Sequence, residues 1–129
     1  MFQQDHILRQ VQQLAQVLAQ VLFRKRTDEL EAQARLAEGL EDALGLDLPS
    51  VRRLTRGEIL AMCAPGGVLA AEASVALAAL LSEDAAAEGR ERALWLFEHA
   101  VASGEAVPFD VHDRVASLRA SLDGPASTP

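Results

Sequence analysis

The spacing of apolar residues near the N-terminus constrains the fold more than any other feature of the chain. Ile7, Val11, Leu14, Leu18 and Val21 follow one another in steps of four, three, four and three residues. Steps of this size place side chains on one face of an α-helix, whereas a half-buried strand would need strict alternation. The pattern predicts a helix over residues 3–24. Further apolar positions widen this face beyond half the circumference, so we expect the helix to contact two neighbours.

The rest of the chain also favours helices. No segment alternates β-branched or aromatic residues with polar ones, as a strand would. Ala, Leu, Glu, Gln and Arg, which lose little conformational freedom in a helix, dominate the composition. The 129 residues fit one domain. The sequence therefore predicts an all-α fold, a small bundle of five to six helices built from two αα-hairpins and a short middle helix.

Capping residues and breaks set the predicted boundaries within a single domain over residues 1–123. Thr27 is the expected N-cap of the second helix and Gly45 its C-terminal stop, which gives a hairpin over residues 3–45. A single turn is expected at Pro49. Thr55 and Glu58 form a capping box that opens a short helix over residues 55–64.

The second half of the chain is divided in the same way. Pro65-Gly66-Gly67 is a break that precedes a second hairpin over residues 68–103. Its first helix, over residues 68–87, is alanine-rich and apolar on nearly every side, so we expect it to be the central, most buried helix. Gly89 is expected to separate it from the next helix. Asp110 caps a C-terminal helix over residues 110–122, and residues 124–129 are a predicted disordered tail.

The second hairpin resembles a tetratricopeptide repeat (TPR). Ala93, Phe97 and Ala100 match the small and aromatic positions of that motif's second helix, and Leu77, Leu80 and Leu81 fall at packing positions of the first. The first-helix Trp, Gly and Tyr are replaced by Leu77, Leu81 and Asp84, the closing Pro by Glu105, and no second copy follows at a 34-residue period. The resemblance covers about a quarter of the chain. It implies a degenerate, TPR-like helical hairpin.

Two further segments resemble a family of small, uncharacterised bacterial helical proteins. They are the opening residues 2–10 (FQQDHILRQ) and residues 44–47 (LGLD). This resemblance implies a protein of bacterial origin with a TPR-like helical fold, and it implies no particular activity.

Charge and targeting signals narrow the class of protein. The net charge of −7 argues against a general affinity for nucleic acid or anionic membranes. A single cysteine, Cys63, allows no disulfide within the chain and gives no sign of an oxidising compartment. The first residues lack the basic and apolar regions of a signal peptide, and the apolar run over 68–81 is shorter than the ~20 residues of a membrane span. We expect a cytoplasmic protein without a membrane segment.

No residue pattern predicts catalysis. His6, His99 and His112 fall in three different helices, without a second ligand at the spacing that a metal site needs. Cys63 lies in a short apolar helix, where a lone cysteine is typical of a core residue rather than a nucleophile. Gly66-Gly67 lacks the pattern of a phosphate-binding loop. We therefore predict no catalytic residue, no metal site and no cofactor, and an enzyme is the least favoured class.

Trp95, His99 and Arg92 form the first candidate partner-binding surface. Trp95 and His99 are four residues apart on the predicted fifth helix, opposite the face of Ala93 and Phe97. An exposed Trp among charged residues is typical of an interface hot spot. The alternative is that the C-terminal helix covers Trp95.

The first helix carries the second candidate surface, marked by Gln10, Gln13 and Gln16. Its polar side is uncharged between Arg9 and Arg24. One interpretation is a homodimer seam across which glutamines bond. The other is ordinary packing within one chain.

The third candidate surface is basic and would bind anions. It comprises Arg24, Lys25, Arg26, Arg52, Arg53 and Arg56. The alternative for the first three is that they complement the dipole at the end of the first helix. Only Phe23 adds an aromatic ring, which argues against nucleic acid. The leading hypothesis is thus a non-enzymatic protein-interaction or scaffold domain that self-associates, and the alternative is a nucleic-acid or anion-binding accessory protein.

Overall fold

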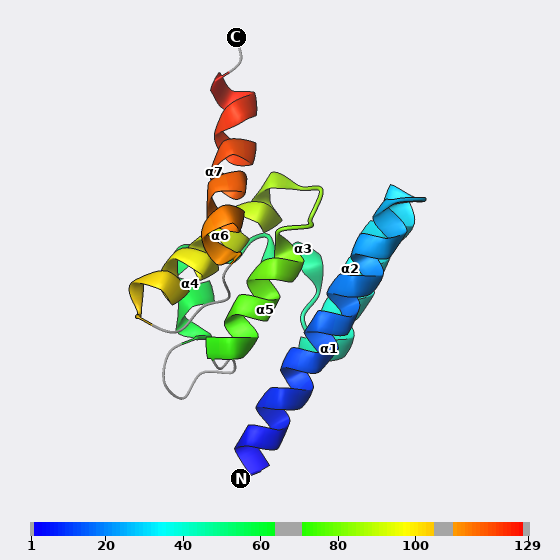
Figure 1. Ribbon diagram of the computed structural model, residues 1–129, viewed down its shortest axis with the longest axis vertical. Helices are drawn as coiled ribbons and strands as arrows, with labels where there is room; N and C mark the ends of the chain where they lie inside the picture. The colour runs from blue at the N-terminus through cyan, green and yellow to red at the C-terminus, as the bar shows by residue number, and fades with distance from the viewer. Residues whose placement is uncertain (1, 64–70, 105–109, 128–129) are drawn as a thin grey trace.

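A computed structural model describes residues 2–63, 71–104 and 110–127 of the chain. Over these ranges it contains seven α-helices and no strand (Figure 1). The helices are α1 (Phe2–Lys25), α2 (Glu29–Leu44), α3 (Leu48–Val51), α4 (Arg56–Ala61), α5 (Ala71–Leu81), α6 (Ala87–Ala102) and α7 (Val111–Ser127). The predicted all-α fold, a small helical bundle, is confirmed, with the expected turn at Pro49 forming α3.

Helices α1 and α2 form the first hairpin and lie side by side (Figure 1). The N-cap of α2 is Asp28 rather than the predicted Thr27, because the extended Asp28 backbone lets its carboxylate accept a hydrogen bond from the Glu31 amide at 3.2 Å. The Thr27 hydroxyl donates back to the Arg24 carbonyl instead. Gly45 ends α2 as predicted, with a φ of 68° that favours glycine.

The two helices of this hairpin approach each other closely at Gly39. A Cβ atom added to Gly39 would lie 2.6 Å from Cγ2 of Val17 on α1, which is too short for a van der Waals contact. The absence of a side chain at this position therefore sets the spacing between α1 and α2.

The second hairpin differs from its predicted boundaries. The helix expected over residues 68–87 ends at Leu81, and residues 82–86 form a turn. The Asp84 carboxylate stabilises this turn by accepting a hydrogen bond from the Ala86 amide at 3.1 Å. Gly89 does not separate two helices as predicted. It lies inside α6, where an added Cβ would be 2.6 Å from Cγ of Asp84.

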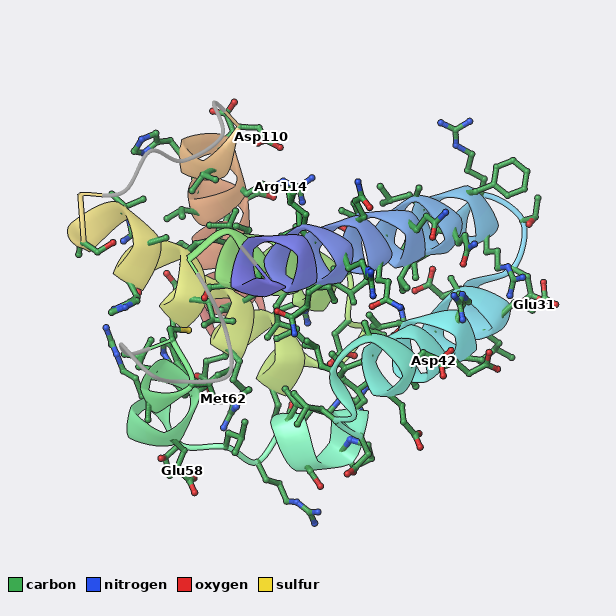
Figure 2. All side chains as sticks on the ribbon, turned by 90° about the horizontal axis from the view of Figure 1, so that it is seen from below. Glu31, Asp42, Glu58, Met62, Asp110 and Arg114 are labelled. Atoms are coloured by element: carbon green, nitrogen blue, oxygen red, sulfur yellow. The ribbon has the colours of Figure 1, made fainter. Side chains whose placement is uncertain are left out.

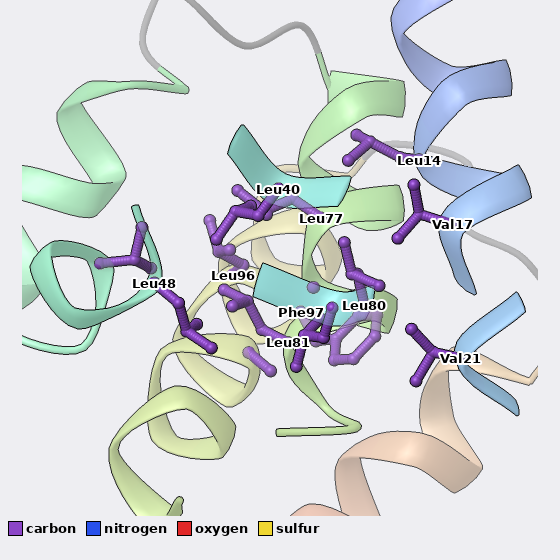
Figure 3. Packing of buried hydrophobic residues seen from close by; sticks show 14 of the residues in the cluster. Leu14, Val17, Val21, Leu40, Leu48, Leu77, Leu80, Leu81, Leu96 and Phe97 are labelled. Atoms are coloured by element: carbon purple, nitrogen blue, oxygen red, sulfur yellow. The ribbon is translucent and has the colours of Figure 1, made fainter. Parts of the chain in front are cut away.

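The core joins the two hairpins around α5. Helix α5 packs against α1 and α6, and none of residues 73–81 is exposed, so the expectation of a central helix is confirmed. Figure 3 shows Leu14, Val17 and Val21 of α1 directed toward Leu77 and Leu80. The outer helices α4 and α7 both pack against α6.

The predicted ends of two other helices were also wrong. Helix α4 ends at Ala61 rather than at residue 64, and α7 continues through Ser127, so residues 124–127 of the predicted tail are helical. A Gly-Pro pair disfavours the continuation of a helix, because proline donates no backbone hydrogen bond and crowds the preceding residue. It does not forbid that continuation, so it marks only a probable boundary. The predicted break at Pro65-Gly66-Gly67 lies outside the described residues. Within the described helices, none has the length and apolarity needed to cross a membrane.

Candidate functional site

The turn between α5 and α6 pairs two of the predicted anion-binding cations with carboxylates of the same chain. Lys25 Nζ lies 3.0 Å from Oε1 of Glu83. Arg52 donates from Nε to Oδ2 of Asp84 at 2.9 Å and from Nη2 to Oδ1 at 2.7 Å. The hydrogen bonds to Asp84 raise the pKa of the Arg52 guanidinium. Lys25 and Arg52 are therefore engaged in holding the fold.

The other four cations of the basic set are exposed. Within the described ranges of the chain, Arg24, Arg26, Arg53 and Arg56 take part in no ion pair. The two groups of basic residues contact the same turn, one through Glu83 and the other through Asp84. The exposed residues Arg24, Arg26, Arg53 and Arg56 are therefore the members of the basic set that stay available to an external anion.

Gln33 of α2 also binds the α5–α6 turn, an interaction that the sequence reasoning missed. Its Nε2 donates to the Glu83 carbonyl at 3.0 Å, and its Oε1 accepts from the Ala85 amide at 3.1 Å. The only available signal was the Ser82-Glu83-Asp84 triplet after the apolar run, which is typical of a turn.

Arg92 is buried, contrary to its predicted place on an exposed surface. Its Nε and Nη2 atoms donate to the Leu54 carbonyl at 3.0 and 2.8 Å, and Nη1 donates to the Glu88 carbonyl at 3.1 Å. The Arg92 guanidinium carbon lies 4.7 Å from the ring centroid of Trp95, in a cation–π contact. These contacts tie the segment after α3 to the face of α6.

Trp95 and His99 are both half-buried, and Trp95 packs against the core. Helix α6 contacts α4 and α7 as well as α5, so little of its circumference is free. The predicted cluster of Trp95, His99 and Arg92 is therefore not an exposed unit, because Arg92 and part of Trp95 serve internal packing.

The three candidate glutamines of α1 do not share a face. Gln10 is buried, with 9% of its surface exposed, whereas Gln13 and Gln16 are exposed. Gln10 and Gln16 are six residues apart, which at ~3.6 residues per turn places them about 120° apart around the helix. The inward side of α1 is set by Leu14, Val17 and Val21. A seam that uses Gln10 together with Gln16 is thus incompatible with this structure.

A second stripe, uncharged and apolar except for Gln12, follows the side of α1 opposite the core. It consists of Leu8, Gln12, Ala15, Ala19 and Leu22, which we call the outer stripe. All five residues are exposed and are spaced in steps of four, three, four and three. The side chains of Leu8 and Leu22 are exposed to 58% and 41%, and no member of the stripe is charged. Helix α1 therefore has two apolar faces, of which only one is covered.

Three carboxylates have a lowered pKa, and each stabilises a local structure. The hydroxyl and then the amide of Ser50 lower the pKa of Asp47. The amide and hydroxyl of Thr55 lower the pKa of Glu58, and the Arg114 guanidinium lowers that of Asp110. Figure 2 shows Glu58 at α4, and Asp110 and Arg114 at the start of α7. Helix capping and pairing account for these shifts, so they do not identify an acid–base couple.

Cys63 is half-buried and packs against the core, as expected for a structural cysteine. The Ser74 hydroxyl donates to its Sγ at 3.1 Å. Burial raises the pKa of the thiol, and the hydrogen bond from Ser74 opposes this shift only in part. Among the described residues, no three His, Cys, Asp or Glu side chains are grouped closely enough to hold a metal ion.

No family model matches the sequence, and neither a curated protein nor a solved structure matches it. The buried positions of Ala93, Phe97 and Ala100 agree with the packing role that the TPR motif gives them. The TPR-like resemblance itself stays a prediction.

Proposed function

We propose that this chain is a non-enzymatic protein-interaction or scaffold domain. The observation that carries the proposal is the outer stripe of α1. Of the five large hydrophobic side chains that are exposed in the described part of the chain, four lie on the α1–α2 hairpin: Leu8, Leu22, Phe23 and Leu30. Their concentration on one hairpin distinguishes them from single apolar residues scattered over a surface.

The physical argument rests on burial and charge. Leaving a Leu or Phe side chain in water forfeits about 1.5–3 kcal/mol relative to full burial. Contact surfaces between proteins differ from the remaining surface by their low content of charged residues at the centre. The outer stripe has no charge although the chain carries 31 charged residues, from 12 basic and 19 acidic ones. Ala15 and Ala19 at its middle would let another helix approach closely.

The domain is further proposed to act in the cytoplasm. The single cysteine, Cys63, is a free thiol, which is the usual state of cysteine in a reducing compartment.

Site-specific photo-crosslinking in living cells tests this function. A photoreactive amino acid at Ala19, on the outer stripe, should yield a discrete crosslinked protein species. The same amino acid at Ala34, an exposed alanine of α2 outside the stripe, is the matched control. Equal or absent crosslinking at the two positions would contradict an interaction surface on α1.

A second candidate function is an anion-binding or nucleic-acid-binding accessory protein. It is supported by the exposure of Arg24, Arg26, Arg53 and Arg56, none of which takes part in an ion pair within the described ranges. The overall charge of −7 and the pairing of Lys25 and Arg52 with carboxylates count against it. Binding to single-stranded RNA that persists at physiological salt, and that falls in an Arg53→Ala/Arg56→Ala variant, would favour this candidate.

A further inference from the structure

We infer that the partner covering the outer stripe is a second copy of this chain, paired through α1 in an antiparallel orientation. The inference rests on the proposed function, because it identifies the occupant of the same surface. Four features of the stripe carry it: its spacing, its symmetry, the residues along one edge and its lack of charge.

The spacing is that of a helix pair. Steps of four and three residues keep a seam facing a partner helix along its length. In this register Gln12 and Ala19 occupy one core position of the heptad, and Leu8, Ala15 and Leu22 occupy the other. The stripe runs over 15 residues, from Leu8 to Leu22, and its 14 rises of ~1.5 Å give a length of about 21 Å. It therefore presents a continuous contact of about four turns.

The order of side chains along the stripe is nearly the same in both directions. Leucines lie at its two ends and the small Ala15 at its middle. In an antiparallel pair centred on Ala15, Leu8 of one copy lies against Leu22 of the partner subunit. The two large side chains at each end then fill the space that diverging helices leave, and the alanines allow close approach at the crossing point.

One edge of the stripe favours the antiparallel orientation. Arg9, Gln16 and Phe23 follow one another in steps of seven along this edge, and all three are exposed. Antiparallel helices bring like edges together in reverse order, so Gln16 meets the partner's Gln16 and Arg9 meets the partner's Phe23. Two amides can exchange hydrogen bonds. A guanidinium over a phenyl face gains a cation–π contact, which would cover a ring that is 72% exposed in the single chain.

A parallel pair would use the edge less well. It would set Gln16 and Phe23 against the opposite edge, where Val11 and Leu18 are already half-buried against the core. It would also align the two helix dipoles, whereas antiparallel helices place opposite ends together.

Charge explains why a second copy fits here. Two chains of net charge −7 repel, so a stable contact between them must use a surface without acidic residues. The sequence of α1 contains no charged residue between Arg9 and Arg24. One helix face is small beside a standard interface of about 1,600 Å². We therefore expect a reversible dimer that dissociates on dilution.

Sedimentation equilibrium of the purified full chain over a concentration series tests self-association. The wild-type chain should approach twice the monomer mass as the concentration rises. Ala15→Glu should remain monomeric, because two carboxylates would face each other at the centre of the seam. Ala34→Glu makes the same change at an exposed alanine of α2 and should dimerise like the wild type. Equal helicity by circular dichroism confirms that both variants are folded.

Disulfide trapping tests the orientation in a Cys63→Ala background. A mixture of Leu8→Cys and Leu22→Cys chains should form the mixed disulfide readily, and neither chain alone should form one at a comparable rate. If disulfides form preferentially between two Leu8→Cys chains, or between two Leu22→Cys chains, the antiparallel arrangement is overturned.

The same experiments separate this inference from the proposed function. A wild-type chain that stays monomeric at every concentration overturns the second copy as occupant. If the residue-19 crosslink then identifies a different protein, the interaction function stands with another partner. If that crosslink is absent as well, both proposals fail.

Discussion

Arg52 and Asp84 form a two-pronged ion pair between the segment after α3 and the α5–α6 turn. The Asp84 side chain is fully buried, whereas that of Arg52 is 31% exposed. The same carboxylate also accepts a hydrogen bond from the Ala86 amide and lies close to Gly89. Arg52, a candidate for binding an external anion, thus already holds an anion of its own chain.

Removing the cation of this pair should destabilise the protein strongly. Arg52→Ala leaves the Asp84 carboxylate buried without its counter-charge, and such a change costs about 3–5 kcal/mol. We expect the lower end of this range, because Arg52 is partly exposed and water can enter the vacated space. Arg53→Ala, at the exposed neighbouring residue, should change the unfolding free energy by less than about 0.5 kcal/mol. Urea denaturation of both variants measures the difference, and equal midpoints would refute this role of Arg52.

The close approach of α1 and α2 predicts an unusual response to alanine at Gly39. Gly→Ala in a helix is normally stabilising, but Gly39→Ala should destabilise by about 1–3 kcal/mol through overpacking against Val17. Val17→Ala opens space for the new methyl group. The double variant should therefore be more stable than the sum of the single effects predicts, by at least about 0.5 kcal/mol. The unfolding free energies of the two single variants and the double variant are measured by thermal or urea denaturation. If the two single effects add up to the effect of the double variant, this contact is excluded.

The matched control for that cycle is Gly57→Ala. The added Cβ would have only the Thr55 hydroxyl oxygen near it, at 4.0 Å. Because Gly57 is helical and has this free space, the substitution should stabilise the protein by up to about 1 kcal/mol.

Glu58 should contribute to stability in a pH-dependent way. Hydrogen bonds from Thr55 lower the folded-state pKa of Glu58 below its ordinary value of 4.5. A lowered folded-state pKa gives stability that is fully present above the unfolded-state pKa and is lost as the pH falls through the folded-state pKa. Glu58→Gln cannot lose this stability on protonation. Its unfolding free energy should therefore decline less than that of the wild type between about pH 6 and about pH 3. Parallel declines would contradict the capping-box contribution.

Cys63 should react slowly with alkylating reagents at neutral pH. Burial raises the pKa of its thiol above the ordinary value of 9.0, and the thiolate is the reactive form. The alkylation rate of the folded chain should reach half its maximum only above pH 9.0, whereas the urea-unfolded chain should titrate at lower pH. A half-maximum below 9.0 in the folded chain would show that Cys63 is more accessible than the structure indicates.

Local patterns were sufficient to predict most helices and the inward face of α1. Two such patterns are the apolar steps of Leu14, Leu18 and Val21 and the left-handed glycine at Gly45. Both depend only on residues that are close in sequence, so they can be recognised in a single sequence. The end of α5 is different. It depends on Lys25, Gln33 and Arg52, which are 32 to 58 residues away from the turn in sequence. Propensity alone continued the alanine-rich helix through that turn.

The candidate surfaces were predicted less well, for a related reason. Helix α1 is apolar on more than one side, and only its packing on α2 and α5 decides that Gln10 faces inward and Gln16 outward. Gly89 carries the same signal whether it breaks a helix or admits the side chain of Asp84. Arg92 is indistinguishable from a surface arginine until the Leu54 carbonyl is placed beside it.

The segment over residues 52–54 is held at both ends by the second hairpin, through Asp84 at Arg52 and through Arg92 at the Leu54 carbonyl. It connects the two halves of the chain and, because both of its ends are hydrogen-bonded to the second hairpin, it does not act as a flexible linker. When α6 unfolds, it withdraws Arg92 from the segment and Gly89 from beside Asp84, so the segment and the turn lose their support together. We therefore expect the two hairpins to unfold in a single transition, so that neither half of the sequence could be exchanged without the other.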